Sequence, residues 1–216
     1  MDGVILRNIP PMFTPKGNSQ SYPGDASKLN GEVAQKATKY RFVIGGLIAF
    51  LAWSLGLGWY ITGPITPLLI SHYGISNSTA GFLTSIVFLV HIVFAIPLSM
   101  LVSRVGLKML LGLGALAASA QLLSFMATTS FPLLLGLRAI HGMGFIFLFT
   151  TIGPLFMQWF HPKELPLANG VFVIAVSLGI TTSTFVVAPL SEVIGWEVVL
   201  SLSGGMSLVS AFIWIV

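Results

Sequence analysis

Charge is scarce in most of this chain. Between Phe42 and Val216 there are only seven Asp, Glu, Lys and Arg residues, and six of them lie between apolar runs. The whole chain is 7% charged and 55% hydrophobic, whereas a soluble domain carries roughly 25% charged residues. This scarcity excludes a soluble globular domain and predicts an all-α membrane protein embedded in a lipid bilayer.

Further absences exclude other classes of protein. The chain has no cysteine, so a disulfide, a thiol nucleophile and a cysteine metal site are all excluded. No Asp or Glu lies within an apolar run, and there is no His-x-x-x-His cluster. We therefore predict that the chain is not an enzyme and holds no metal or cofactor. The net charge of +4 is spread over several loops, which argues against nucleic-acid binding.

The apolar runs predict six transmembrane helices, because each is close to the length of about 20 residues that a helix needs to cross the hydrocarbon core. The domain organisation predicted is a disordered cytoplasmic tail over 1–41, with a short surface helix as an alternative for 32–41, followed by a six-helix domain over 42–216. Gly-Pro dipeptides predict kinks in the first and fourth spans. We place the spans at 42–71, 79–102, 107–127, 131–158, 167–190 and 198–216.

Lysine and arginine predict the orientation of the chain. They lie beside the first span and in the loops after spans two and four, whereas the loops after spans one, three and five have none. Because positive residues collect on the cytoplasmic side of a membrane, we expect a multi-pass plasma-membrane protein with a cytoplasmic N-terminus.

A weak internal repeat links spans two and five. Both spans end in Pro-Leu-Ser, at 97–99 and at 189–191. Helices three apart in such a chain run in opposite directions across the bilayer. The repeat therefore predicts two inverted three-helix units, a signature of secondary transporters.

The loop at 99–108 resembles the signature between helices two and three of the major facilitator superfamily, Gly-x-Leu-Ala-Asp-Arg-x-Gly-Arg-Lys. Arg104, Gly106 and Lys108 match this pattern, and the resemblance implies that they form a gating loop. Ser103 stands where the family has an aspartate that helps to latch the inner gate, so this latch is in doubt here. A plain basic turn is the alternative explanation of the loop.

Two further segments resemble the same family. Residues 138–144 match the pattern Arg-x-x-x-Gly-x-Gly of helix four, and residues 159–170 resemble the loop into helix five. The Gly-Pro-x-x-Gly pattern of antiporters is absent from span five, which favours uptake or symport. The order of these motifs implies the N-terminal six-helix half of this fold, built as two inverted three-helix repeats.

The family usually has twelve helices in two halves, so the resemblance implies a second six-helix half as partner. That half is expected in the same chain beyond Val216, in another copy or in another chain. We favour a fragment or N-terminal half over a half-size protein, because a natural end after a sixth span usually carries polar residues.

Arg138 is the charge inside an apolar run, and a buried charge requires a partner. Three partners are open: an anionic substrate, a carboxylate of the second half, or backbone carbonyls of neighbouring helices. Arginine binds oxyanions through two parallel hydrogen bonds. This favours an anionic small solute, with a role in packing or gating as the alternative.

Two histidines and two aromatic residues complete the candidate site. His141 lies one turn from Arg138 and His91 lies near the middle of span two. Either can couple transport to protons, or remain neutral and hydrogen-bonded between helices. The resemblance implies that helices one and four line the cavity, which makes Tyr60 and Trp53 cavity candidates, with interfacial aromatic residues as the alternative.

These features favour a secondary active transporter that moves a small solute by alternating access. Arg138 favours an organic or inorganic anion as that solute. The alternative is a non-transporting membrane receptor or an assembly subunit built on the same half scaffold. A channel is disfavoured because the sequence has neither a polar stripe nor a filter loop.

Overall fold

The computed structural model of the chain describes residues 25–215. The chain divides into two units, residues 1–39 and 40–216. The described part of the first unit is the beginning of helix α1, which spans Asp25–Tyr60.

The predicted disordered tail is partly helical. Residues 1–24 lie outside the described range, whereas residues 25–41 belong to α1. This segment contains Ala, Lys, Glu and Gln, which are good helix formers, so its polar composition is compatible with a helix.

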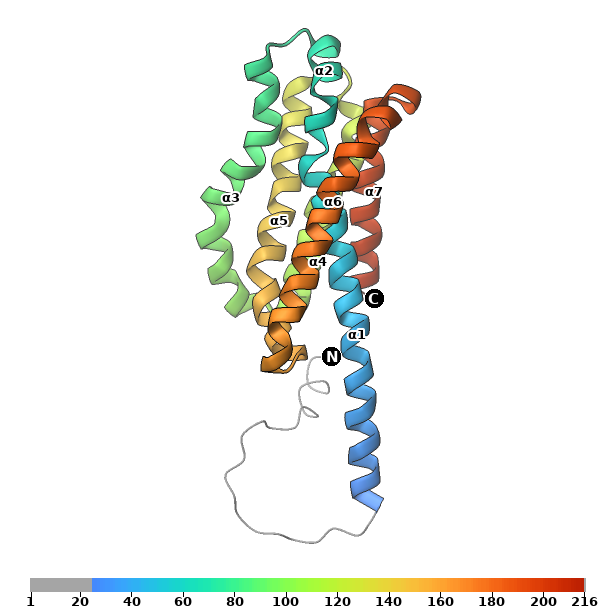
Figure 1. The fold of residues 1–216 in the computed structure, drawn as a ribbon. Helices are drawn as coiled ribbons and strands as arrows, with labels where there is room; N and C mark the ends of the chain where they lie inside the picture. Colours follow the sequence, from blue (N-terminus) through green and yellow to red (C-terminus); the bar gives the residue numbers. More distant parts are fainter. Residues whose placement is uncertain (1–24, 216) are drawn as a thin grey trace. The chain divides into compact units, whose positions relative to one another are not determined.

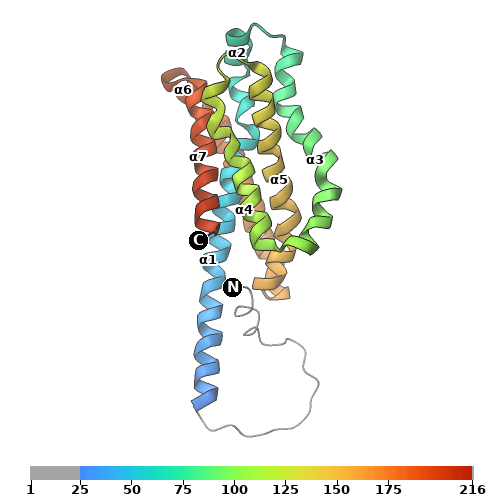
Figure 2. The ribbon, with the colours of Figure 1, turned by 180° about the vertical axis from the view of Figure 1, so that it is seen from behind.

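The unit from residue 40 onward is a bundle of long helices (Figures 1 and 2). Six of its segments are long and apolar enough to cross a membrane, which confirms the predicted all-α fold with six spans. Residues 25–215 contain no strand. The elements are α1 (Asp25–Tyr60), α2 (Thr62–Tyr73), α3 (Asn77–Val105), α4 (Leu107–Ala118), η2 (Ser119–Ala127), α5 (Phe131–Trp159), η3 (Pro162–Glu164), α6 (Leu165–Ile194) and α7 (Trp196–Ile215).

The first span is interrupted within the bundle. α1 ends at Tyr60 and α2 begins at Thr62. Pro64 has no amide hydrogen, and a proline ring clashes with the carbonyl four residues earlier, which here belongs to Tyr60. The kink predicted for this span is therefore a break of one residue in the helix, at Ile61, whose backbone keeps right-handed helical angles (φ −58°, ψ −29°). α2 continues through Pro67, and α5 continues through Pro154.

Glycines with positive φ form the turns at the ends of three helices. Gly74 ends α2 at a φ of 64°, Gly106 separates α3 from α4 at 85°, and Gly195 separates α6 from α7 at 89°. Residues with a Cβ rarely adopt this conformation. Gly106 of the predicted gating loop is thus required by the turn itself.

α5 lies inside the bundle, where it packs against both α3 and α4. α3 lies at a lateral edge of the bundle in both views (Figures 1 and 2). The least buried spans are those formed by α3 and by η3 with α6. These are spans two and five, the pair that carries the sequence repeat, and their outer faces are apolar and exposed.

The second half of the third span is a 3₁₀ helix. η2 is nine residues long, although 3₁₀ segments longer than three or four residues are uncommon. α7 packs directly on it, and a Cβ atom at Gly204 would overlap the backbone of Leu122. The absence of a side chain at Gly204 is therefore a condition for this contact.

We expect the Gly204→Ala variant to be destabilised by about 1–3 kcal/mol, because the methyl group overpacks a contact between two backbones. Thermal unfolding of the purified protein in detergent measures the change. Gly205→Ala is the matched control, since its nearest atom is the side-chain Cδ1 of Leu122 at an ordinary 3.7 Å. Equal unfolding temperatures for the two variants would contradict the close approach of α7 to η2.

Candidate functional site

Arg138 is fully buried in α5, and its guanidinium group donates hydrogen bonds to three backbone carbonyls. Nε donates to the carbonyl of Leu83 at 3.2 Å, Nη1 to that of Gly58 at 2.7 Å and Nη2 to that of Trp59 at 2.9 Å. Nη2 also lies 3.4 Å from Oγ1 of Thr62. Arg138 thereby joins α5 to α3 and to both sides of the break in the first span.

The break explains why an arginine is needed at this position. The last four carbonyls of a helix have no partner within that helix, and the carbonyls of Gly58 and Trp59 belong to the last turn of α1. Inside a membrane no bulk water is present to satisfy them. A cation at a helix C-terminus is also favoured by the helix dipole, so Arg138 acts as the cap of α1.

The charge of Arg138 is not neutralised by a nearby carboxylate of this chain. The sequence contains no Asp or Glu between Phe42 and Lys163, and the ion pair found among the described side chains joins Arg41 to Glu164. The partners of Arg138 in the structure are backbone carbonyls of neighbouring helices, which is one of the three partners that the sequence left open. Four of the five N–H donors of Arg138 are directed at oxygen atoms of the protein, so the paired fork that would hold an anion is already largely occupied.

His141 lies one turn further along α5 and is also fully buried. Its Nδ1 lies 3.0 Å from the carbonyl oxygen of Ala118, the last residue of α4. This geometry requires a proton on Nδ1, and Nε2 has no partner among the described residues. The side-chain amide of Gln121 is also buried and has no hydrogen-bond partner among the described residues. The imidazole of His141 and the amide of Gln121 both lie next to the position that a Cβ atom on Gly58 would occupy. A buried polar site therefore lies beside Arg138.

His91 lies in a different environment, a pocket lined by aromatic side chains. This aromatic pocket has a volume of about 220 Å³ and is formed by Trp59 of α1, by residues of α3 and by residues of α5. His91 is the midpoint of Asn77–Val105, and Phe145 is the midpoint of Phe131–Trp159, so the pocket lies midway along these two helices. The lining residues are Trp59, Val87, Phe88, His91, Phe145 and Phe149.

The aromatic pocket is directly connected to Arg138. The carbonyl of Trp59 accepts a hydrogen bond from Arg138, while its indole packs against Phe145 with ring centroids 4.6 Å apart. The indole also lies 5.4 Å from the ring of Phe88. By holding the end of α1, Arg138 fixes where Trp59 enters the pocket.

The other predicted residues lie outside this pocket. Trp53 packs toward α6, where its Nε1 donates to Oγ1 of Thr182 at 3.4 Å. Tyr60 is exposed at the end of α1, so it borders the break without lining the pocket. Arg104 and Lys108 are exposed on either side of the Gly106 turn, at the opposite end of their helices from the break.

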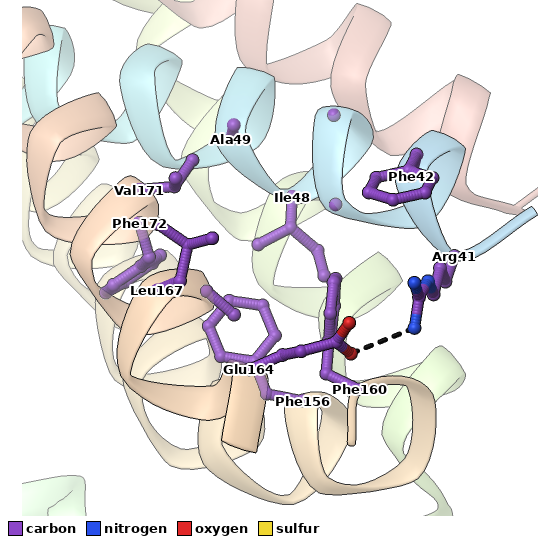
Figure 3. A pocket seen from close by; sticks show the side chains of 13 residues that line it. Arg41, Phe42, Ile48, Ala49, Phe156, Phe160, Glu164, Leu167, Val171 and Phe172 are labelled. Atoms are coloured by element: carbon purple, nitrogen blue, oxygen red, sulfur yellow. Dashed lines mark hydrogen bonds and ion pairs between the residues drawn. The ribbon is translucent and has the colours of Figure 1, made fainter. Parts of the chain in front are cut away.

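A second cavity lies where α1 and α6 meet near Arg41 and Glu164. It has a volume of about 260 Å³, and Figure 3 shows apolar and aromatic side chains directed into it. Nη1 of Arg41 donates to Oε2 of Glu164 at 2.9 Å across its mouth (Figure 3). Oε2 also accepts from the backbone amide of His161 at 3.0 Å. Arg41 and Glu164 form an ion pair with each other, and the cavity lies where α5 ends and α6 begins, so the aromatic pocket is the better candidate for a solute site.

Sequence reasoning missed most of the aromatic pocket. His141, Phe145 and Phe149 are spaced four residues apart and share one face of α5, which was a readable signal. Gln121, a lone amide in an apolar run, was a signal for the buried polar site beside Arg138. Phe88 carried no signal, because a phenylalanine in a span is equally compatible with contact to lipid.

Comparisons with known proteins place the chain in a family. The sequence profile of the Major Facilitator Superfamily matches residues 48–216. The chain belongs to the Major Facilitator Superfamily, which confirms the resemblance of its loop and helix motifs. The family and the six spans together make it a multi-pass membrane protein related to transporters of small solutes.

Two relatives share this region. The chain is 26% identical over 161 residues to an uncharacterized protein of Campylobacter jejuni, covering 74% of this chain and 50% of that protein. It is 29% identical over 163 residues to an uncharacterized MFS-type transporter of Caenorhabditis elegans, covering 74% of this chain and 28% of that protein. The chain thus spans half or less of the length of these curated relatives.

Proposed function

We propose that this chain forms one six-helix half of a secondary active transporter, which moves a small solute across the plasma membrane by alternating access. The observation that carries the proposal is the interrupted first span, capped by Arg138 next to a pocket midway along α3 and α5. Secondary transporters place their substrate sites near the membrane midplane and build them from discontinuous helices. The lysine and arginine distribution supports a cytoplasmic N-terminus.

The second half of the transporter is expected to cover α3 and α6. These helices form the least buried spans, and exposed apolar side chains such as Ile92 and Phe185 extend along them. A pseudo-symmetric partner would bury them as matching surfaces. The partner half is supplied by the same polypeptide, by another copy or by another chain.

Single cysteines introduced into a background from which any cysteine of the second half is removed test alternating access, and this chain contributes no cysteine of its own. We expect a cysteine at Phe88, in the aromatic pocket, to react with a membrane-impermeant thiol reagent both in right-side-out and in inside-out vesicles of the full-length protein. Reaction requires water to reach the thiolate. In alternating access the pocket opens to each side of the membrane in turn, so water and the reagent reach it from both sides.

The matched control is a cysteine at Phe212, which is exposed on α7 and expected to face lipid. It should react in neither preparation. A cysteine at Lys108 should react in inside-out vesicles alone, which tests the orientation. Labelling of the Phe88 position from one side of the membrane only would contradict alternating access and favour a static receptor or subunit.

A further inference from the structure

The walls of the aromatic pocket are a nearly continuous set of rings. Trp59 contacts Phe145 with centroids 4.6 Å apart, Phe145 stacks on Phe149 at 5.8 Å, and Phe149 meets the imidazole of His91 at 6.1 Å. The pocket volume of about 220 Å³ lies below the 300–1,000 Å³ that is typical of sites for drug-sized ligands. A solute with a single ring fits these dimensions and gains offset or edge contacts with the walls.

The polar groups of the pocket are few and are mainly donors. The indole of Trp59 carries an N–H donor, and the imidazole of His91 presents a donor in either tautomer. His91 makes a ring contact with Phe149 but no hydrogen bond to another described residue. A solute group that accepts hydrogen bonds is therefore complementary to this pocket.

The charge nearby is positive. Arg138 donates to the carbonyl of Trp59, so a guanidinium lies one peptide unit from the pocket, and no carboxylate occurs between Phe42 and Lys163. In a low-dielectric interior a charge acts over several ångströms with little screening. This field opposes a cation against the rings and favours an anion, although four of the five N–H donors of Arg138 are already directed at protein oxygens.

We propose that the aromatic pocket binds a small aromatic carboxylate, with its ring among Trp59, Phe88 and Phe149 and its carboxylate directed to His91. This assignment of a substrate class rests on the proposed function as a transporter. It differs from a direct contact between the anion and Arg138, because Arg138 positions Trp59 and supplies the field.

Binding of four probes to the purified full-length protein tests the substrate class. Benzoate has a ring and a negative charge, benzyl alcohol a neutral ring, benzylamine a ring and a positive charge, and acetate a negative charge without a ring. We expect calorimetric titration to show benzoate binding about tenfold more tightly than each of the others. Benzylamine or acetate binding as tightly as benzoate, or no binding of benzoate, would overturn the proposal.

Variants of the pocket test the location. We expect Phe149→Leu and His91→Phe each to weaken benzoate binding by about tenfold, because each removes a ring contact or the donor. Phe212→Leu, on the exposed face of α7, is the matched control and should bind like the parent protein. Thermal unfolding confirms that each variant is folded. Unchanged benzoate affinity in a folded Phe149→Leu protein would overturn the assignment.

Failure of the proposal can be told apart from failure of the proposed function. Benzoate that binds in a pocket-dependent way but is never taken up by proteoliposomes would support the site and contradict transport. Uptake of a non-aromatic solute at a rate that Phe149→Leu does not change would support transport and overturn the aromatic site.

Discussion

Replacement of Arg138 by alanine is expected to abolish transport and to lower the stability of the protein by about 3 kcal/mol or more. The substitution leaves the carbonyls of Gly58, Trp59 and Leu83 without the donor that they have in the parent protein. A buried polar group without a partner costs roughly 1–3 kcal/mol. Transport is lost because α1 then ends without a cap beside the aromatic pocket.

Arg138→Lys separates charge from geometry. The ammonium group keeps the positive charge but cannot present the planar fork of donors that reaches two helices at once. We expect intermediate stability and strongly reduced uptake. Thermal unfolding and proteoliposome uptake, measured on the same preparations, show whether the charge alone or the geometry of the donors is required.

Arg104→Ala is the control for the loss of an arginine, because Arg104 is exposed at a turn; its unfolding temperature should remain close to that of the parent. A direct anion site at Arg138 makes a different prediction from a helix cap. It would leave Arg138→Ala as stable as the parent while removing uptake of anions alone. A folded, fully stable Arg138→Ala protein would therefore contradict the capping role.

Substitution of Gly179 by alanine is expected to have the second largest effect. A Cβ atom at this position would overlap the carbonyl oxygen of Trp53 and lie within 2.6 Å of the amide nitrogen of Leu57. On the opposite helix, a Cβ atom at Gly56 would overlap the carbonyl oxygen of Val176. The backbones of α1 and α6 are thus in direct contact, as in other membrane helix pairs packed through small residues.

Backbone atoms within a helix cannot move aside separately, so Gly179→Ala forces the two helices apart. We expect a destabilisation of about 1–3 kcal/mol or more and a large loss of uptake, since α1 carries Trp59 into the pocket. Gly170→Ala is the matched control on the same helix, because a Cβ atom there meets nothing within 4 Å. Similar thermal unfolding and uptake for both variants would show that α1 and α6 are less closely packed than described.

The sequence predicted the class of fold well, for a physical reason. Transmembrane spans depend on the local composition of about 20 residues, so the six spans were readable one at a time. The break in the first span was foreseen as a kink, because Pro64 acts on a carbonyl only four residues away. The order of the motifs at 99–108, 138–144 and 159–170 similarly indicated the family, because each motif is a local stretch of sequence.

The residues of the candidate site could be predicted only in part from the sequence. Arg138 and His141 were identified because polar residues in an apolar run are rare, and His91 for the same reason. The partners of Arg138 could not be predicted from the sequence, since the carbonyls that it binds belong to residues 55 to 80 positions away. Backbone carbonyls also carry no signature in a sequence, as every residue has one.

The sequence by itself determined that the chain crosses the membrane six times, belongs to a transporter family and holds one arginine that must be partnered. Only the tertiary structure decided that this partner is the broken end of α1 and that four aromatic residues from three helices line one pocket. Hydropathy and proline geometry are local properties of the chain. The choice of contacts depends on which faces of distant helices meet, and that is decided by packing.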